Sequence, residues 1–598
     1  MTESFLTIAV FLPLLMAPIA YILGKKKGTT IVTWFSFAIL FISTIFILVS
    51  GLGLSPENPV HEEIYPWSQF GDFGLRLDGF SAPFAVTIYI ISTVLTIYSK
   101  PYMVRKIAGQ FENLKPKKEK DYDLPGDDDT DEINIPNKND DKNINHDTNL
   151  MEHNSSNTNV QQQLSKNLYE KEIHIDSKIN DQIGLYFALF LTFAMGMVGT
   201  VLATNLIEFY AFFELMLIPA FFLVALYGYP TRKRVSLMFF FWTHVGAVLL
   251  LLGLISMGLF SGGFDFDTIR ENIVNIPQQW LGLVVFAVVV GIAVKLGAFI
   301  LHVWIPPTYA ESPTPISAMI AAAMSGIGVY ALFRIWIDLL SISYSDYSIY
   351  INLWGLITMI YGGAMALMQD DLKKLLAYSS ISHIGYIIFG FGTQSVLGLT
   401  GSTMMWVAHA LGEAILFMAV GSIILQARTR SISNLGGLAR KMPYTATITM
   451  IGVLTMIGVP PTAGFMAEWI MFNGALQSGT EQMDSFRVLL FALAILSTIL
   501  TAAYLLRMFK RVFFGKLPKE FENMRDSSKI IIVPMAFIAA LSLSMGVYPD
   551  PVINPVIGYI ENLFINDTTI SFTPVTGNNI DSNVISISSE NTHESISK

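Results

Sequence analysis

Cysteine is absent from the 598 residues of this sequence. A chain without cysteine forms no disulfide, binds no metal through thiolates and ligates no iron–sulfur cluster. Charged residues are scarce as well, at 14% of the chain, against about 25% in ordinary soluble proteins. The net charge of −9 argues against nucleic-acid binding as a main task. This composition excludes a soluble globular enzyme, a disordered regulator and a fibrous protein.

Apolar residues make up 52% of the chain. Windows of about 20 apolar residues, each long enough to cross a bilayer as a helix, recur almost to the end of the sequence. We therefore expect an all-α polytopic membrane protein with about 14 transmembrane helices. Their approximate ranges are 4–23, 30–51, 80–103, 184–203, 206–227, 236–260, 280–301, 314–338, 349–368, 374–396, 402–426, 447–475, 487–511 and 530–548.

The first window is expected to be a membrane helix and not a secretory signal. A signal carries positive charge before its apolar core, whereas here Glu3 precedes the core and three lysines follow it at 25–27. If the N-terminus is outside, the cytoplasmic loops hold most of the lysines and arginines, as the positive-inside rule requires. The sequence therefore predicts a multi-pass protein of the cell (plasma) membrane with both termini outside. The basic loops lie near 25–27, 232–234, 373–374, 428–441 and 510–519.

Two segments are too polar to cross a membrane. Residues 104–183 are rich in Asn, Asp, Lys and Gln, and such a composition buries too little apolar surface to offset the entropy of ordering. We expect a disordered cytoplasmic insertion there and a polar tail at 566–598. The first three helices then lie within residues 1–103, and the last transmembrane helix lies at 530–548.

Several ionisable residues fall inside the apolar windows, where a charge costs at least about 2.5–3.5 kcal/mol. They are the candidate site residues: Glu214, Lys295, His383, His409, Glu413 and Glu468. His409 and Glu413 are four residues apart, so they share one face of a helix. Residues of this kind at membrane depth indicate a polar path through the protein.

Helix breakers stand beside three of these residues. Pro219 follows Glu214, Gly297 follows Lys295, and prolines at 460–461 precede Glu468. Broken backbone at membrane depth is tolerated only where it is buried in protein or lines a wet cavity. Charges beside broken helices therefore indicate an ion pathway.

Simpler roles remain open. His383 and His409 could each be only a hydrogen-bond partner between helices, and Lys295 with Glu214 could be only a structural ion pair. Other polar residues have plain expected roles. These are a packing contact for His244, a solvated boundary position for Glu208 and a topology signal for the lysines at 373–374.

Three longer motifs resemble those of a known family. They are Phe209-Tyr-Ala-Phe-Phe-Glu214, the stretch from Gln369-Asp-Asp to His383-Ile-Gly385, and Gly464-Phe-Met-Ala-Glu468. The sequence resembles the antiporter-like membrane subunits of respiratory complex I, over residues 1–103 and 184–550. Glu468 matches the M-type of that family, since its sister types and the Mrp antiporter subunits usually carry lysine there.

The resemblance implies both a fold and a function. The fold would contain two inverted five-helix repeats, at 184–338 and 349–511, each with one broken helix. The function would be proton translocation in the membrane arm of a complex I-like oxidoreductase that passes electrons from NADH, or another donor, to quinone. The six candidate residues would form the proton relay. The chain would hold no cofactor, metal or redox centre, and its partners would be redox-arm and other antiporter-like subunits.

Three positions depart from the family pattern. Gly326 stands where the eighth helix usually carries a central lysine, Gly297 replaces a proline, and Tyr309 replaces a loop histidine. The first departure suggests a path through water and His383 instead, with His409 and Glu413 as partial substitutes. It also leaves open a structural subunit with a degenerate channel. The other alternative is a subunit of a Mrp-type Na+/H+ antiporter or of a membrane-bound hydrogenase.

Overall fold

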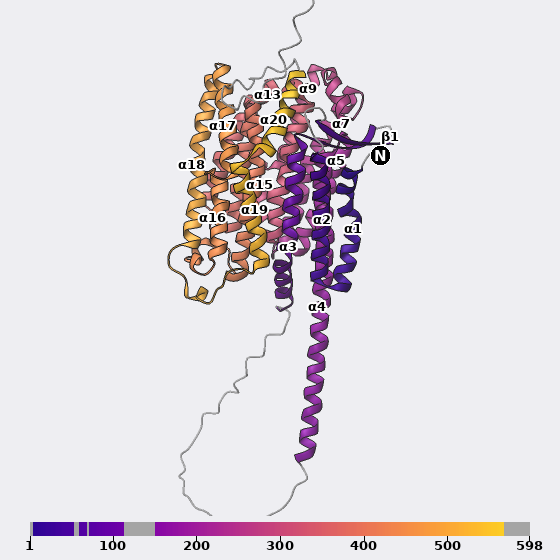
Figure 1. The fold of residues 1–598 in the computed structure, drawn as a ribbon, viewed down its shortest axis with the longest axis vertical. Coiled ribbons are helices and arrows are strands. Elements are labelled where there is room, and N and C mark those ends of the chain that lie inside the picture. Colours follow the sequence, from indigo (N-terminus) through magenta and orange to yellow (C-terminus); the bar gives the residue numbers. More distant parts are fainter. Residues whose placement is uncertain (1–3, 53–58, 69–70, 113–149, 567–598) are drawn as a thin grey trace, which may run out of the picture.

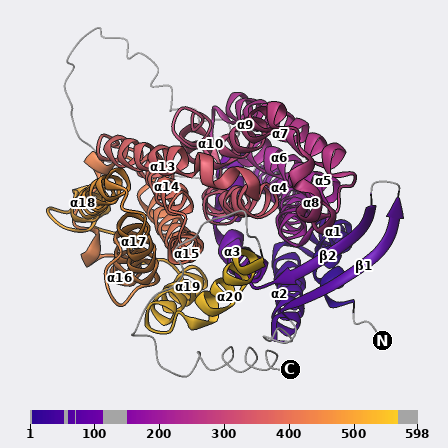
Figure 2. The same ribbon diagram turned by 90° about the horizontal axis from the view of Figure 1, so that it is seen from above.

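A computed structural model describes residues 4–52, 59–68, 71–112 and 150–566 of the chain. Long helices stand side by side in one bundle, and one of them, α4, extends far beyond the others (Figure 1). Viewed along the bundle, the chain passes from the N-terminal helices through the first half of the sequence to α16–α18 at the far side (Figure 2). It then returns through α19 and α20 toward the N-terminal helices.

The elements before residue 340 include a β-hairpin and a helix with two π-helical segments, η2 and η3. In chain order they are α1 (Phe5–Lys27), α2 (Thr29–Leu52), β1 (Val60–Ser68), β2 (Gly71–Asp78), α3 (Ser81–Glu112), α4 (Leu150–Leu202), α5 (Leu206–Leu215), α6 (Leu217–Tyr227), α7 (Arg232–Ser261), α8 (Phe266–Asn272), η1 (Ile273–Asn275), α9 (Gln278–Leu296), α10 (Ile305–Glu311), α11 (Thr314–Met319), η2 (Ile320–Met324), α12 (Ser325–Ala331) and η3 (Leu332–Leu339).

The elements after residue 340 are helical. They are η4 (Ser341–Ser343), α13 (Tyr344–Leu367), α14 (Leu372–Phe391), α15 (Val396–Ala427), η5 (Ile432–Asn434), η6 (Leu438–Arg440), α16 (Pro443–Ile457), α17 (Ala463–Glu481), α18 (Ser485–Phe513), η7 (Lys519–Phe521), α19 (Lys529–Val547) and α20 (Asp550–Asn566).

Every predicted apolar window coincides with one helix or with a run of consecutive helical segments, which confirms the polytopic helical fold. By length and composition, 12 helices of the described chain qualify as membrane spans. The windows that do not qualify are α14, whose first turns carry lysines and serines, and the interrupted pair α16 and α17. The central helices are the most buried, because the window of α15 is 94% buried and that of Thr314–Leu339 is 100% buried.

The flanks of the polar insertion differ from the prediction. Within 104–183, helix α3 continues to Glu112 and helix α4 already begins at Leu150, so these flanks are helical and the prediction of disorder is wrong there. The physical reason is local: residues 150–183 contain no proline or glycine, and glutamine, glutamate and lysine are good helix formers. Residues 113–149 of the insertion lie outside the described chain, as does the predicted tail beyond Asn566, the last residue of α20.

The hairpin of β1 and β2 was not predicted from the sequence. Its strands pair antiparallel, from Val60 opposite Asp78 to Ser68 opposite Gly71. Glu63 of β1 accepts hydrogen bonds from the backbone N–H groups of Leu6 (2.7 Å) and Thr7 (2.9 Å). The first N–H groups of a helix have no partner within it and favour a negative charge. The hairpin therefore caps α1.

A buried ionic network joins the hairpin to α20. The Arg334 guanidinium of η3 donates to Asp78 (2.6 Å) and to Asp338 (2.8 Å), and Arg270 also donates to Asp338 (2.9 Å). The hydroxyl of Tyr559 in α20 donates to Asp338 at 2.7 Å. Buried charges are tolerated when they are paired and hydrogen-bonded. We call this end of the bundle the hairpin end.

A second ion pair links β2 to α8 at the surface of the hairpin end. Arg76 donates to Asp267, with 2.5 Å between the guanidinium nitrogen and the carboxylate oxygen, and to Glu62 at 2.8 Å. The hydrogen bond from Arg76 lowers the pKa of the Asp267 carboxyl below its usual value. Asp267 therefore keeps its negative charge to a lower pH than a free aspartate would.

The basic loops gather at the opposite end of the bundle, which we call the basic end. There Lys25 lies 3.9 Å from Asp181 of α4, and Arg430 pairs with Asp371 (2.6 Å) and Glu311 (3.4 Å). The long extension of α4 leaves the bundle at this end (Figure 1). The separation of a basic end from a hairpin end agrees with the charge pattern of the loops.

Candidate functional site

The predicted helix breaks are confirmed, and each has a local cause. Pro219 has no N–H to donate to the carbonyl of residue 215, and the helix divides at Met216 into α5 and α6. Helix α9 ends at Gly297 (φ 75°) and α16 ends at Gly458 (φ 74°), both in the left-handed region that glycine adopts most easily. The two halves of the chain thus contain one glycine-capped broken helix each.

Glu214 lies at the last turn of α5, beside the first of these breaks. One of its carboxylate oxygens lies 2.9 Å from Nδ1 of His244 on α7, and the other has no hydrogen-bond partner among the described residues. The direct ion pair of Glu214 with Lys295, which the sequence left open, is therefore not the arrangement observed. His244 is not merely a packing contact, and its position inside an apolar window was the signal that could have revealed it.

Lys295 lies two residues before Gly297 and is only 3% exposed. Its ammonium has no hydrogen-bond partner within the described chain and lies 4.8 Å from the centre of the Phe213 ring. Glu214 is close enough to interact with it electrostatically without touching it. A buried ammonium without a hydrogen bond is costly, and this marks Lys295 as a functional candidate.

His383 of α14 lies between two backbone carbonyls. Its Nδ1 is 2.9 Å from the carbonyl oxygen of Ser379, and its Nε2 is 2.8 Å from that of Met456. The Met456 carbonyl is free because the residue four positions on is Pro460, which has no N–H. A neutral imidazole donates from only one nitrogen. Both contacts become hydrogen bonds when the ring carries a second proton, so the site can hold a proton without rearrangement.

His409 and Glu413 lie one turn apart on the central helix α15. The His409 ring stacks on that of His383, with 5.5 Å between ring centres, and its Nε2 lies 3.3 Å from the hydroxyl of Ser380. Glu413 is completely buried, and neither carboxylate oxygen has a hydrogen-bond partner within the described chain. A carboxyl group in this position is normally hydrogen-bonded, so the absence of a partner marks Glu413 as a functional candidate.

Glu468 of α17 is half-buried, and its carboxylate packs against the backbone of Gly458 at the break. One of its oxygens is buried without a hydrogen-bond partner in the described residues. The hydroxyl of Tyr504 lies close enough to interact electrostatically with both Glu468 and Glu413, and it donates to Ser379 at 3.0 Å. Tyr504 was not predicted, since a tyrosine in an apolar window carries no signal of its own.

The space beside Gly326, where the sequence departs from the family pattern, is filled by another side chain. A β-carbon at Gly326 would overlap the indole of Trp406, which is fully buried on α15 and stacks on Phe84 with 4.3 Å between ring centres. The indole N–H has no hydrogen-bond partner among the described residues. Trp406 therefore occupies the space in which a side chain on the eighth membrane helix would lie.

Two further expectations are corrected by the structure. Glu208 is 2% exposed and accepts the N–H of Gly74 from the hairpin at 3.2 Å, so it is not a solvated boundary residue. Lys373 is fully buried, and its ammonium donates to the carbonyls of Ala310 (3.2 Å) and Ser312 (2.5 Å). This lysine joins the start of α14 to the junction of α10 and α11, a role beyond that of a topology signal.

The candidate residues form two groups. Glu214 lies near Lys295 in the first half of the chain, with His244 added to them. His383 and His409 are in ring contact in the second half, and Tyr504 lies close to both acidic residues of that half. No contact between the two groups is seen among the described residues, and the described chain has no cluster of three potential metal ligands.

Residues 203–494 match the family model described as NADH:quinone oxidoreductase/Mrp antiporter, TM. The M subunit of F(420)H(2) dehydrogenase from Methanosarcina mazei is 35% identical over 388 residues, which cover 63% of this chain and 76% of that relative. The chain belongs to the NADH:quinone oxidoreductase/Mrp antiporter transmembrane family. NADH-quinone oxidoreductase subunit M from Rickettsia prowazekii is 31% identical over 388 residues, covering 65% of this chain and 77% of the relative.

The fold of this NADH:quinone oxidoreductase/Mrp antiporter family member also matches a solved structure. One chain of the Mrp complex from Dietzia sp. superposes with a TM-score of 0.73 at 17% identity, covering 95% of this chain and 98% of the other. At that identity the match shows the fold alone. The range that matches the family model, 203–494, contains every candidate residue from Glu214 to Glu468.

Proposed function

We propose that this chain is a proton-translocating subunit in the membrane arm of a complex I-like quinone oxidoreductase. The observation that carries the proposal is the presence of two buried ionisable groups, Lys295 and Glu413, that have no hydrogen-bond partner among the described residues and lie beside broken helices. Such groups are expensive to keep in a purely structural protein. The names of the relatives, subunits M of NADH-quinone and F(420)H(2) oxidoreductases, support the same role.

In the proposed mechanism, the Glu214 carboxylate alternates between two partners, His244 and Lys295. While this carboxylate binds His244, the Lys295 ammonium has no hydrogen-bond partner in the described part of the chain. A small movement of Glu214 toward Lys295 would stabilise the ammonium, and the return movement would favour release of its proton. Moving one proton against 100 mV costs about 2.3 kcal/mol. The two arrangements must therefore differ in free energy by at least that order.

In the second half, His383, His409 and Glu413 would carry the proton onward, and Glu468 would be the terminal site. His383 can hold a second proton between its two carbonyl acceptors. The hydroxyls of Ser379, Ser380 and Tyr504 line the spaces between these groups. Water would have to complete the path, and the hairpin end would face the outside of the cell membrane.

No redox step is assigned to this chain. We propose that electrons pass through partner subunits, from NADH or another donor to quinone. Movements of these subunits would shift Glu214 between His244 and Lys295. The chain itself would bind neither nucleotide nor quinone, and its only transported species would be the proton.

Replacing Glu413 with glutamine tests the proposed function. We expect proton pumping by the assembled complex to fall at least tenfold, while electron transfer and thermal unfolding change little, because glutamine keeps the shape and removes only the titrating group. The measurement is the ratio of proton uptake to electron transfer in reconstituted vesicles. Glu481→Gln, an exposed change at the end of α17, is the matched control. Unchanged pumping in Glu413→Gln would return this residue to a packing role.

A second prediction concerns Glu214. We expect Glu214→Ala to abolish coupled pumping while the protein still assembles, because Lys295 then has no carboxylate nearby. His244→Phe keeps the stacking on Phe240, whose ring centre lies 5.6 Å away, but removes the contact with Glu214. It should reduce pumping less than Glu214→Ala does. Glu271→Ala, at an exposed residue of α8, is the control; normal proton transport by Glu214→Ala would refute the role.

A structural subunit with a degenerate channel is the second candidate, favoured by the indole of Trp406 in the space beside Gly326. It predicts that none of the charged residues affects pumping. A Mrp-type sodium/proton antiporter subunit is the third, favoured by the shared fold. It predicts proton movement that depends on sodium and does not need an electron donor. The vesicle assay separates these possibilities when it is run with and without donor and with sodium or potassium salts.

A further inference from the structure

A cavity of about 560 Å³ opens at the basic end, where α3 and α15 terminate beside Tyr229. Three cationic side chains line it: Arg105 and Lys106 from α3, and Arg428 from the end of α15. Ile424 and Leu425, one turn earlier on α15, supply an apolar wall. The cavity is separate from the candidate proton-transfer residues, and none of those residues lines it.

The charge of this cavity is not compensated by the described part of the chain. Arg105, Lys106 and Arg428 form no ion pair with a described carboxylate, and Lys106 rests on the Tyr229 ring at 3.4 Å from its centre. The nearest acidic neighbour, Glu311, is already paired with Arg430 at 3.4 Å. A concave surface that gathers two arginines and a lysine without a described carboxylate partner favours an anion.

The backbone at Arg428 adds a second observation. This residue ends α15 with φ 54° and ψ 18°, a left-handed conformation that glycine usually adopts at the end of a helix. A residue with a β-carbon is disfavoured there, and such positions often accompany function. Glycine would fit this position, yet the chain places an arginine at the mouth of the cavity.

We propose that this cavity binds the phosphate headgroup of an anionic phospholipid. The lining combines cations for the phosphate with an apolar wall for the start of the acyl chains, as an amphipathic ligand requires. Basic pockets between transmembrane helices at the positively charged side of a protein suit such headgroups. A soluble phosphate compound would make no use of the wall formed by Ile424 and Leu425.

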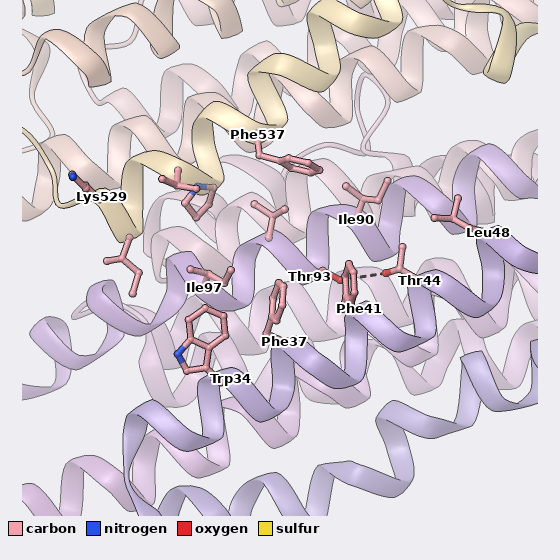
Figure 3. A pocket seen from close by; sticks show the side chains of 14 residues that line it. Trp34, Phe37, Phe41, Thr44, Leu48, Ile90, Thr93, Ile97, Lys529 and Phe537 are labelled. Atoms are coloured by element: carbon pink, nitrogen blue, oxygen red, sulfur yellow. Dashed lines mark hydrogen bonds between the residues drawn. The ribbon is translucent and has the colours of Figure 1, made fainter.

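A second, larger groove is lined almost entirely by apolar side chains. It has a volume of about 610 Å³ between α2, α3 and α19, with aromatic and aliphatic side chains along its length and Lys529 near one end (Figure 3). Apart from the Thr44–Thr93 hydrogen bond of 3.3 Å, its lining offers almost no polar contact. Such an apolar lining does not select one ligand over another.

The test is a binding titration of the purified full-length chain in a neutral detergent. The probes are phosphatidylglycerol, phosphatidylcholine and inorganic phosphate, and bound lipid is counted by native mass spectrometry. We expect phosphatidylglycerol to bind more tightly than the other two. Each of Arg105→Gln, Lys106→Gln and Arg428→Gln should weaken that binding about fivefold, and more salt should weaken it further.

Two further variants make the result specific. Lys26→Gln/Lys27→Gln/Arg234→Gln removes three exposed positive charges from the basic end, against one in each cavity variant, without touching the cavity, and should leave binding unchanged. Gly109→Trp fills the cavity while keeping all its charges. A side chain there meets nothing within 4 Å of its β-carbon, so the fold should persist while binding falls at least tenfold.

Three results would overturn the proposal. Equal loss of binding in the control variant would indicate a general attraction to positive surface. Equal affinity for inorganic phosphate would indicate a soluble anion as the ligand. Binding that appears only after deletion of residues 117–145 would indicate that the acidic insertion of this chain, and not a lipid, occupies the cavity.

Discussion

Replacing Lys295 with methionine is expected to abolish proton pumping without weakening the fold. The ammonium is 3% exposed and has no hydrogen-bond partner within the described chain. Because an isolated buried charge is costly to keep away from water, its removal is expected to leave the free energy of unfolding unchanged or to raise it. Methionine preserves the length and the apolar contacts of the side chain. A loss of function together with unchanged or greater stability is therefore the expected result.

The measurements are proton uptake per electron transferred in vesicles and the midpoint of thermal unfolding in the same preparation. Lys374→Met is the matched control, because Lys374 is an exposed lysine at the start of α14. It should alter neither quantity. Full pumping by Lys295→Met would remove this residue from the relay, whereas a large loss of stability would show that the ammonium has a structural partner.

The second large effect is expected at Gly326 and Trp406. A β-carbon at Gly326 would overlap the Trp406 indole, so Gly326→Ala should destabilise the protein by about 1–3 kcal/mol through overpacking. Trp406→Ala should cost about 3–5 kcal/mol, because it leaves a cavity in the core. The double variant should cost less than the sum by at least about 1 kcal/mol, since the new methyl group then enters vacated space.

A lysine at position 326 extends this prediction. Gly326→Lys alone should fail to assemble, while Gly326→Lys with Trp406→Ala should be recovered as a folded protein. Gly558→Ala is the control, since a β-carbon there meets nothing within 4 Å. The quantities measured are the yield of assembled protein and its unfolding midpoint. If the losses in free energy of unfolding at Gly326 and Trp406 are additive, the indole moves aside easily and does not define the space beside Gly326.

The histidine at 244 and the glutamate at 208 show where reasoning from sequence failed. Both lie in apolar surroundings along the chain, and nothing local distinguishes the one that contacts Glu214 from the one that contacts a β-hairpin. Their partners lie 30 and 134 residues away in the sequence. Such contacts depend on how helices pack, and the amphipathic periodicity that reveals packing is weak in helices that are apolar on most sides.

What the sequence determined by itself was everything that depends on local chemistry. Apolar windows specify membrane helices because their backbone groups must be satisfied within each segment. Pro219 and Pro460 specify breaks because proline has no backbone N–H, and Gly297 specifies one because glycine permits a positive φ. The motifs were enough to indicate the family, and the polar side chains at membrane depth were enough to indicate candidates.

Only the tertiary structure decided which of these candidates meet. It placed Glu214 against His244 in place of Lys295, left Glu413 without a hydrogen-bond partner among the described residues, and filled the space beside Gly326 with Trp406. The physical reason is that each contact joins side chains from helices whose mutual rotation and depth are set by packing across the whole bundle. Local sequence carries no information about that rotation, whereas the energetic cost of a buried charge depends on it directly.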